Sequence, residues 1–481
     1  MPFLSPEDSV PTDADIGVVG TGFASSFFLW RLLREAPPDL RVVVFERGEY
    51  HEHPEHIARF LERWDRFRDD YVSTGTAKKP WRFTNAFGGS SNCWAGNTPR
   101  MLPSDFETAT RYGAGVDWPI SYDDLERYYV EAEQVMAVAG NGGPHYMSQP
   151  HPLPPHRLSL PEQLLEQAWP GAYFRMPTVR ASIATDQRPR CCANGVCTMC
   201  PVDAKFTILN GLAGIYDDPR VTVVLGTRVH SVDVAAGRAQ GLNWRRANAE
   251  GTTKTDHAVL GANGLFNPEI LLRSGDPSPL TGRRLHEQVG IVGQVLLDGV
   301  DSFQGTTNIS GIGYMLYDND DRRQSKAAAL LETKSVGRMR ADPGRWRQVL
   351  PIRLVIEDMP DEVNLVRITP DSDKPVAEHN KISDYAQRAV DSAEVDLAEV
   401  FQKLPVERIE IKGFAPTESH IQGTTVMGHD PTSSVTDADG LHHRWGDLRI
   451  LGSSLFPTGA AANPTLTIAA HAIRAAERME L

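Results

Sequence analysis

The sequence predicts an α/β fold, α+β overall, in which a Rossmann-type domain is combined with a discontinuous second domain built on an antiparallel sheet. Residues 15–46 follow the order strand, glycine turn, helix, strand, acid, which is typical of a dinucleotide-binding βαβ unit. Residues 349–356 and 362–368 are apolar runs that we expect to form antiparallel strands beside a helix over 381–402. With 481 residues, the chain is long enough to bury more than one core.

The composition and charge exclude some classes of partner. Hydrophobic residues make up 41% of the chain and charged residues 23%, as in globular proteins. The formal net charge of −13 argues against binding to nucleic acid or to an anionic membrane surface. No apolar run approaches the roughly 20 residues that span a bilayer, so no membrane span is expected. Residues 1–15 show no export signal, and we therefore expect a cytoplasmic protein.

The turn of the βαβ unit carries the residues that a dinucleotide needs. Gly20 permits a tight turn, and Gly22 lets the backbone approach a pyrophosphate at the N-terminus of the helix that begins near Phe23. Ser25 stands where the fingerprint has a third glycine or alanine. Glu46 ends the second strand, where its carboxylate can accept hydrogen bonds from a ribose diol. This unit alone does not distinguish NAD from FAD.

A second loop of small residues, 85–100, offers backbone donors at close range, although such a loop standing alone could be an ordinary surface loop. Its candidate cofactor contacts are Gly88, Gly89, Ser91, Asn92, Cys93 and Trp94.

Two C-terminal segments supply candidate chemistry. Residues 420–428 read His-Ile-Gln-Gly-Thr-Thr-Val-Met-Gly, and a strand is expected over 447–452. Asn463 followed by Pro464 predicts a helix start, with Asn463 as the N-cap and Pro464 at the first helical position. The positive end of that helix would face whatever lies before it.

Together these motifs resemble the glucose–methanol–choline (GMC) family of FAD-dependent oxidoreductases, nearest its pyranose-oxidase-like branch. The resemblance rests on the Gly20 fingerprint, residues 88–100, residues 259–268, residues 420–428 and the helix start at Asn463. It implies FAD as the cofactor, and it implies that His420 and Asn463 flank the reactive face of the flavin. Further cofactor contacts implied on the same basis are Val229, Gly264, Gly452, Pro464 and Thr465.

The chemistry of His420 and Asn463 agrees with alcohol oxidation. An imidazole can take the hydroxyl proton while a hydride leaves the carbon for flavin N5, and Asn463 can hold the substrate oxygen. We expect a sugar, glycoside or polyol-like alcohol as substrate, and a quinone, a protein or oxygen as the electron acceptor. The alternative is a lyase or a non-catalytic flavoprotein of the same fold, against which the His420–Asn463 pair argues.

Four of the five cysteines lie close together, at Cys191, Cys192, Cys197 and Cys200. Thiolate-rich sites select iron–sulfur clusters or zinc, although adjacent cysteines suit a zinc tetrahedron poorly. The run resembles the cluster segment of bacterial FAD-dependent glucose dehydrogenases, with the last spacing one residue shorter. The third interpretation is reduced or disulfide-linked structural cysteines. A cluster would favour a dehydrogenase, and its absence would favour direct reoxidation by oxygen.

Cys93 occupies a position where relatives in the pyranose-oxidase-like branch can carry a histidine bonded to the flavin, so a cysteinyl linkage stands as the alternative to a buried thiol. We expect an FAD-binding domain of residues 1–105, 185–295 and 415–481. Residues 106–184 should form a segment that covers the flavin, and residues 296–414 a substrate-binding domain.

Overall fold

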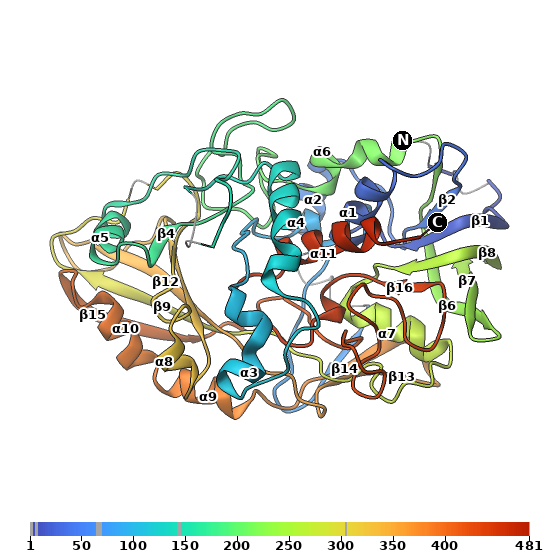
Figure 1. Ribbon diagram of the computed structural model, residues 1–481. Helices are drawn as coiled ribbons and strands as arrows, with labels where there is room; N and C mark the ends of the chain where they lie inside the picture. The colour runs from blue at the N-terminus through green and yellow to red at the C-terminus, as the bar shows by residue number, and fades with distance from the viewer. Residues whose placement is uncertain (1–2, 5–7, 64–69, 142–145, 304, 481) are drawn as a thin grey trace.

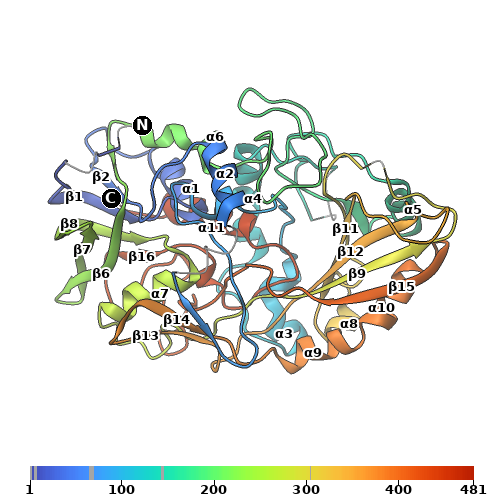
Figure 2. The same cartoon turned by 180° about the vertical axis from the view of Figure 1, so that it is seen from behind.

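The computed structural model describes residues 3–4, 8–63, 70–141, 146–303 and 305–480. Two sheet regions lie at opposite ends of the molecule, and helices α1, α4 and α11 lie between them (Figures 1 and 2). The predicted assignment of residues 1–105, 185–295 and 415–481 to one domain, with 106–184 and 296–414 outside it, stays a prediction.

The first region is a seven-stranded mixed sheet in the order β5-β2-β1-β8-β7-β6, with β16 beside β8. The pairs β5–β2, β2–β1, β1–β8 and β8–β16 are parallel, whereas β6, β7 and β8 form an antiparallel meander. Val18 and Val19 in β1, whose side chains point to opposite faces, are both buried, as expected for a strand covered on both faces. The strands are β1 (Asp13–Val19), β2 (Val42–Phe45), β5 (Val221–Val224), β6 (Thr227–Ala235), β7 (Arg238–Arg246), β8 (Ala249–Leu260) and β16 (Leu448–Ile450).

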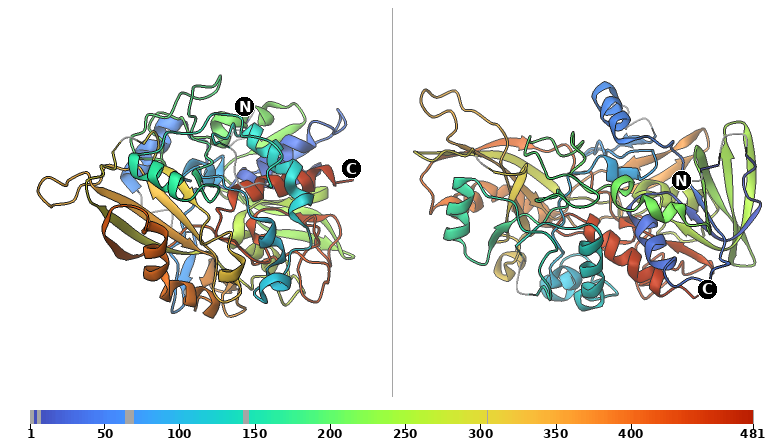
Figure 3. Two further views of the ribbon diagram at one scale, coloured as in Figure 1. Left: turned by 60° about the vertical axis from the view of Figure 1, so that its left-hand side comes forward. Right: turned by 90° about the horizontal axis from the view of Figure 1, so that it is seen from above.

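Three helices that are far apart in the chain pack together beside this sheet. Helix α11 (Thr465–Glu477) contacts both α1 (Phe23–Leu32) and α4 (Tyr122–Val135), and Figure 3 shows it lying between them. On the opposite side of the sheet, α7 (Asn263–Arg273) packs against β6 (Figure 1). The predicted N-terminal βαβ unit is therefore completed by a helix from the other end of the chain.

The second region is a six-stranded antiparallel sheet in the order β15-β9-β12-β11-β10-β4. The predicted strand over 349–356 is confirmed as β12. The run expected at 362–368 does not join this sheet, because β13 pairs instead with β14 in a separate three-stranded sheet that also contains β3. The strands of the two sheets are β4 (Tyr173–Arg175), β9 (Val289–Leu297), β10 (Ile309–Gly313), β11 (Ala329–Lys334), β12 (Val349–Ile356), β15 (Val406–Phe414), β3 (Val72–Thr74), β13 (Leu365–Thr369) and β14 (Ser372–Glu378).

The helix expected over 381–402 is two helices, because the chain breaks at Ser392 between α9 (Asp384–Asp391) and α10 (Ala393–Phe401). These helices pack on β12 and β15. The other helices are α2 (His53–Arg63), α3 (Thr108–Tyr112), α5 (Leu160–Ala168), α6 (Ile208–Gly211) and α8 (Asp320–Arg323). Within the described residues, no helix has the length and apolar character that crossing a membrane requires.

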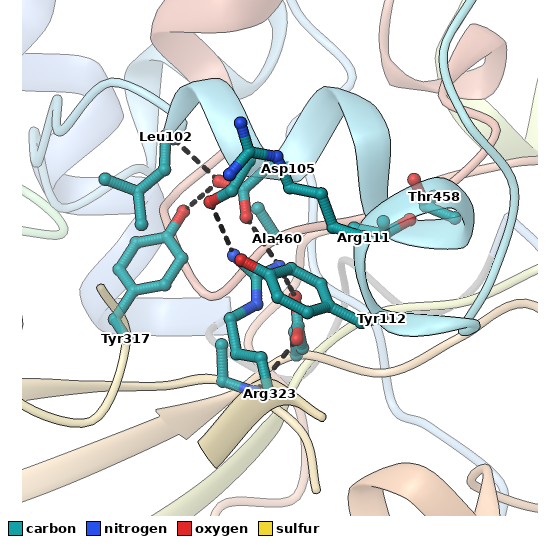
Figure 4. A network of polar contacts seen from close by, with 12 residues as sticks. Leu102, Asp105, Arg111, Tyr112, Tyr317, Arg323, Thr458 and Ala460 are labelled. Atoms are coloured by element: carbon teal, nitrogen blue, oxygen red, sulfur yellow. Dashed lines mark hydrogen bonds and ion pairs between the residues drawn. The ribbon is translucent and has the colours of Figure 1, made fainter. Parts of the chain in front are cut away.

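A buried ionic network ties the 102–112 segment to the antiparallel sheet (Figure 4). Arg323 Nη2 lies 2.9 Å from Asp105 Oδ1 and 3.1 Å from Glu357 Oε2, and all three side chains are inaccessible to solvent. Tyr317 donates a hydrogen bond to Asp105, and the Arg323 guanidinium lies 4.5 Å from the centre of the Tyr112 ring. Two buried carboxyl groups therefore share one buried guanidinium as their counterion.

Replacing Arg323 with methionine should lower the free energy of unfolding by about 3–5 kcal/mol, since it leaves buried carboxylates without their counterion. Burial raises the pKa of Asp105 and of Glu357, and Arg323 opposes that rise. Without Arg323 the carboxyls bind protons more readily in the folded state, so the loss should be smaller at pH 5 than at pH 8.

Urea unfolding at the two pH values measures this difference. Arg245→Met is the matched control, because Arg245 is half exposed and pairs with Glu250 at the surface, and it should change the midpoint little. Equal midpoints for the two variants would contradict the role given to Arg323.

Candidate functional site

A cavity of about 460 Å³ extends from the β1–α1 turn to the antiparallel sheet. Both sheet regions contribute to its wall, together with loops that join them. The lining comes from segments 19–24, 45–47, 82–97, 227–229, 261–270, 417–421, 451–453 and 463–468, with Thr198 and single residues from strands β10, β11 and β12. These segments, distant in sequence, form one continuous surface.

The two glycines of the β1–α1 turn have different structural reasons to be glycine. Gly20 has φ of +89°, and a Cβ there would lie 2.8 Å from the carbonyl oxygen of Gly261. Gly22 has an ordinary φ of −74°, and a Cβ built on it meets no atom within 4 Å. Gly22 precedes the first turn of α1, and no side chain caps that turn. This turn therefore presents backbone N–H groups to an open cradle, which fits the pyrophosphate of FAD.

Thr21 connects the turn to the two other predicted parts of the dinucleotide site. Its hydroxyl donates to Glu46 Oε2 over 2.6 Å and accepts from the Gly88 N–H over 2.9 Å. The Thr21 and Gly48 N–H groups also donate to the Glu46 carboxylate, over 3.0 and 2.8 Å. Burial raises the pKa of Glu46, and these hydrogen bonds oppose that rise. The acid that we expect to bind ribose is thus held rigidly at the cavity wall.

His420 lies at the other end of the cavity, in the loop that follows β15. Its N–H donates to Glu287 Oε2 over 3.2 Å, and its Nδ1 lies 3.1 Å from Gln288 Oε1. Nε2 has no hydrogen-bond partner among the described residues. Burial, and then the nearby charge of Arg353, lowers the pKa of His420 to about 3. The imidazole is therefore neutral near pH 7 and able to accept a proton.

Asn463 also lines the cavity, and its side chain does not behave as the sequence predicts. Helix α11 begins at Thr465, with Pro464 as its N-cap, and no side chain caps this end. Asn463 Oδ1 is buried and has no hydrogen-bond partner among the residues that the structure describes. The expectation of an Asn463 cap is wrong, because the cap position falls on Pro464 and leaves the Asn463 amide oxygen for a ligand.

Charged side chains line the wall formed by the antiparallel sheet. Glu332 on β11 and Arg353 on β12 are direct cross-strand neighbours, so their side chains leave the same face of the sheet. Glu332 Oε1 accepts from Asn97 Nδ2 over 3.1 Å, and Arg353 Nη1 lies 2.8 Å from Glu418 Oε2. The Arg353 Nε is buried without a partner. Glu332 and Arg353 therefore bind Asn97 and Glu418, and Arg353 still has one N–H group without a partner among the described residues.

Most of the predicted site residues line this cavity, and a few lie outside its wall and contact residues next to it. Ser25 packs against Gly261, where an added Cβ would lie 2.0 Å from the Ser25 hydroxyl oxygen. The Ser91 hydroxyl donates to the Gly88 carbonyl, and Asn92 donates to the Phe87 carbonyl. Those in the wall are Gly20, Gly22, Phe23, Glu46, Gly89, Cys93, Trp94, Val229, Gly264, His420, Gly452, Asn463, Pro464 and Thr465, whereas Ser25, Gly88, Ser91 and Asn92 are outside it.

The clustered cysteines do not fit an iron–sulfur or zinc site. Cys197 and Cys200 are buried, Cys191 is half-buried, and Cys192 is exposed. In the part of the chain that the structure describes, no three His, Cys, Asp or Glu side chains form a group that could hold a metal ion. The sulfur of Cys200 instead accepts a hydrogen bond from the Ala204 N–H. The expectation of a cluster at Cys191, Cys192, Cys197 and Cys200 is therefore not supported, because close spacing along the chain does not direct the sulfurs to one centre.

Lys205, just after these cysteines, joins their segment to the cofactor loop. Its ammonium donates to the carbonyls of Asn92, Trp94 and Thr198 over 2.7–3.2 Å. Cys93 lies in the cavity wall, and burial raises the pKa of its thiol. The thiol is thus kept protonated. The cysteinyl linkage to FAD stays a prediction.

Comparisons with known proteins agree with one family. The sequence model described as GMC oxidoreductase matches residues 355–472. The fructose dehydrogenase large subunit of Gluconobacter japonicus is 25% identical over 96% of this chain and 97% of its own length. The 6'''-hydroxyparomomycin C oxidase of Streptomyces lividus is 27% identical over 96% of this chain and 90% of its own. The solved structure of pyridoxine 4-oxidase from Mesorbium loti superposes with a TM-score of 0.70 at 19% identity, covering 97% and 99% of the two chains, which shows a shared fold.

Replacing Gly22 with valine should weaken FAD binding without unfolding the protein. The backbone there suits any residue and the space is open, so the added side chain would occupy only the cradle. We expect FAD affinity to fall by about 10- to 100-fold, corresponding to the ~1–3 kcal/mol that steric crowding costs.

Flavin absorbance per protein and the thermal midpoint of the apoprotein measure the two effects. Gly214→Val is the matched control, because Gly214 also faces open space and lies outside the cavity wall. Unchanged FAD affinity in Gly22→Val would place the dinucleotide elsewhere.

Proposed function

We propose that the chain is a GMC oxidoreductase, an FAD-dependent enzyme that oxidises a CH–OH group of a sugar, glycoside or polyol-like alcohol. The observation that carries the proposal is the single cavity that joins the glycine turn and Glu46 to His420 and Asn463. Its wall fits FAD, since the space beside Gly22 is open and Asn463 Oδ1 has no hydrogen-bond partner in the part of the chain that the structure describes. When bound, FAD would supply the hydride acceptor.

Residues of the chain would accept the proton, orient the substrate and stabilise negative charge. We propose that His420, neutral at working pH, accepts the proton of the substrate hydroxyl at Nε2. Asn463 would orient the oxygen of that hydroxyl, because its amide can donate and accept hydrogen bonds. The free N–H groups at the start of α11 would favour negative charge close to them. Deprotonation at oxygen and departure of a hydride from carbon together give the carbonyl product.

The substrate class follows from the charged wall. Glu332 Oε2 has no hydrogen-bond partner among the described residues, and neither has Arg353 Nε, although the two side chains are cross-strand neighbours. An acceptor and a donor side by side suit a compound with more than one hydroxyl group. By their names, the two relatives act on fructose and on a hydroxyparomomycin. We therefore propose that a polyhydroxylated alcohol binds against β11 and β12.

The proposed acceptor takes electrons directly from FAD. Within the described residues, Cys191, Cys192, Cys197 and Cys200 do not form a group that could hold a metal ion, and the proposal therefore assigns them no part in electron transfer. Oxygen or a quinone that reaches the cavity would serve. Oxygen consumption measured beside dye reduction on one substrate distinguishes these acceptors.

His420→Ala should lower the rate of flavin reduction by about 10²- to 10⁴-fold while FAD stays bound, the range expected for loss of a general base. Anaerobic mixing with a panel of sugars, polyols and simple alcohols measures the rate through bleaching of the flavin absorbance. Asn463→Ala should cost less, as expected for a residue that orients the substrate.

The control is His443→Ala, since His443 bonds Ser434 and lies outside the cavity wall. Unchanged reduction in His420→Ala would assign the base to another residue. If no compound bleached the flavin of the unaltered protein and cyanohydrins were cleaved instead, the oxidoreductase proposal would fail in favour of the lyase.

Glu332→Gln should raise the KM for sugars about tenfold with FAD content unchanged, since hydrogen bonds to charged groups contribute about 1.5–3 kcal/mol. The glutamine keeps an oxygen for Asn97 but loses the negative charge. The KM for a monohydric alcohol should change little. Glu394→Gln, at an exposed position on α10, is the control. An equal rise for both kinds of substrate would mean that Glu332 acts through the shape of the cavity.

A further inference from the structure

Gln288 lies between the two residues that we assign to the reaction. It directly precedes β9 and is 2% exposed. Backbone bonds between His286 and Gln422, 3.0 and 3.1 Å long, place this segment beside the one that carries His420. The Gln288 side chain reaches from there to residues 460–462, just before Asn463.

The orientation of the Gln288 amide follows from its partners. Its Nε2 lies 2.7 Å from the Ala460 carbonyl oxygen and 3.1 Å from that of Ala462. Carbonyl oxygens only accept hydrogen bonds, so the NH₂ group must face them. The amide oxygen, Oε1, is thereby directed at Nδ1 of His420, 3.1 Å away.

This orientation determines the position of the proton on His420. Because Oε1 of Gln288 can only accept, Nδ1 must carry the hydrogen. Burial keeps the imidazole neutral, so its other nitrogen, Nε2, holds the lone pair. Nε2 has no hydrogen-bond partner among the described residues, and His420 lines the cavity. The basic nitrogen is therefore the one left for a substrate.

We propose that Gln288 is a positioning residue that selects the reactive tautomer of His420. Because it also bonds residues 460 and 462, it fixes the position of the His420 ring relative to Asn463. The inference rests on the proposed function. As the substrate O–H bond breaks, its proton binds Nε2 of His420, and FAD, when bound, would supply the acceptor for the hydride that leaves the adjacent carbon. The resulting imidazolium keeps its Nδ1–H bond to Gln288, so the amide need not move. Solvent later takes the proton from Nε2.

The charged groups near His420 do not replace this function. Glu287 accepts from the His420 backbone N–H and pairs with Lys79, 3.2 Å away. Glu418 pairs with Arg353. None of these groups bonds the imidazole ring, whose one protein partner among the described residues is Gln288.

The kinetic test compares two substitutions at the same position. Gln288→Leu removes the acceptor and should lower the flavin-reduction rate about 10- to 100-fold, the usual cost of losing a group that orients a reactive imidazole, with KM and FAD content little changed. Gln288→Glu keeps an oxygen toward Nδ1 and should recover most of the rate. Gln294→Leu is the control, because Gln294 lies on β9, the strand that Gln288 directly precedes, and bonds Glu410 instead. Equal loss in both Gln288 variants would mean that only the bonds to residues 460 and 462 matter, and would overturn the proposal.

A second measurement needs no turnover. Nitrogen-15 NMR of histidine-labelled protein, with the His420 signals identified by their loss in His420→Ala, reports which ring nitrogen bears the hydrogen. We expect the Nδ1–H tautomer at pH 7 in the unaltered protein and a mixture in Gln288→Leu. An Nε2–H tautomer would reject the inference even if alcohol oxidation is confirmed. An Nδ1–H tautomer would uphold it even if no alcohol in the panel is oxidised.

Discussion

The close approach of two turns at the carboxyl ends of β1 and β8 is the constraint on which the cofactor half of the site depends. Gly20 lies against the Gly261 carbonyl, and Gly261 in turn lies against Ser25, so neither glycine has room for a side chain. This contact allows α1 to start directly beside the cavity. Because adjacent parallel strands end at the same edge, both turns open toward one ligand, as in other doubly wound sheets.

The reactive half of the site depends on buried polar groups whose partners are nearly all backbone or amide groups. Glu287 and Gln288 hold the two sides of His420, and Gln288 also fixes the chain before Asn463. A ring held this way stays neutral in a medium of low polarity, where a fixed hydrogen bond is stronger than in water. The arrangement orients the imidazole of His420 through a neutral amide, while the charged groups of Glu287 and Arg353 lie nearby without bonding the ring.

The sequence predicted the features that depend on local order. The βαβ unit, the strand at 349–356, and the placement of His420 and Asn463 in one cavity with the glycine turn belong to this group. It did not predict Glu332, Arg353 or Gln288, because pairing of strands or segments distant in the chain brings the first two into the cavity wall and the third beside His420. The cysteines were misleading for a related reason: spacing brings sulfurs near one another but does not set their directions.

The packing of α11 between α1 and α4 determines when the protein can acquire its cofactor. The segments that line the cavity are spread along the chain from residue 19 to residue 468, and topologies dominated by contacts between distant residues fold slowly. During synthesis, the N-terminal half leaves the ribosome long before β16 and α11 exist. At that stage the β1–α1 turn has neither helix α11 beside α1 nor the part of the cavity wall that carries His420 and Asn463. We therefore expect FAD to bind only after the chain is complete. Until α11 has been made, the apolar surface of α1 that α11 covers stays exposed and accessible to chaperones.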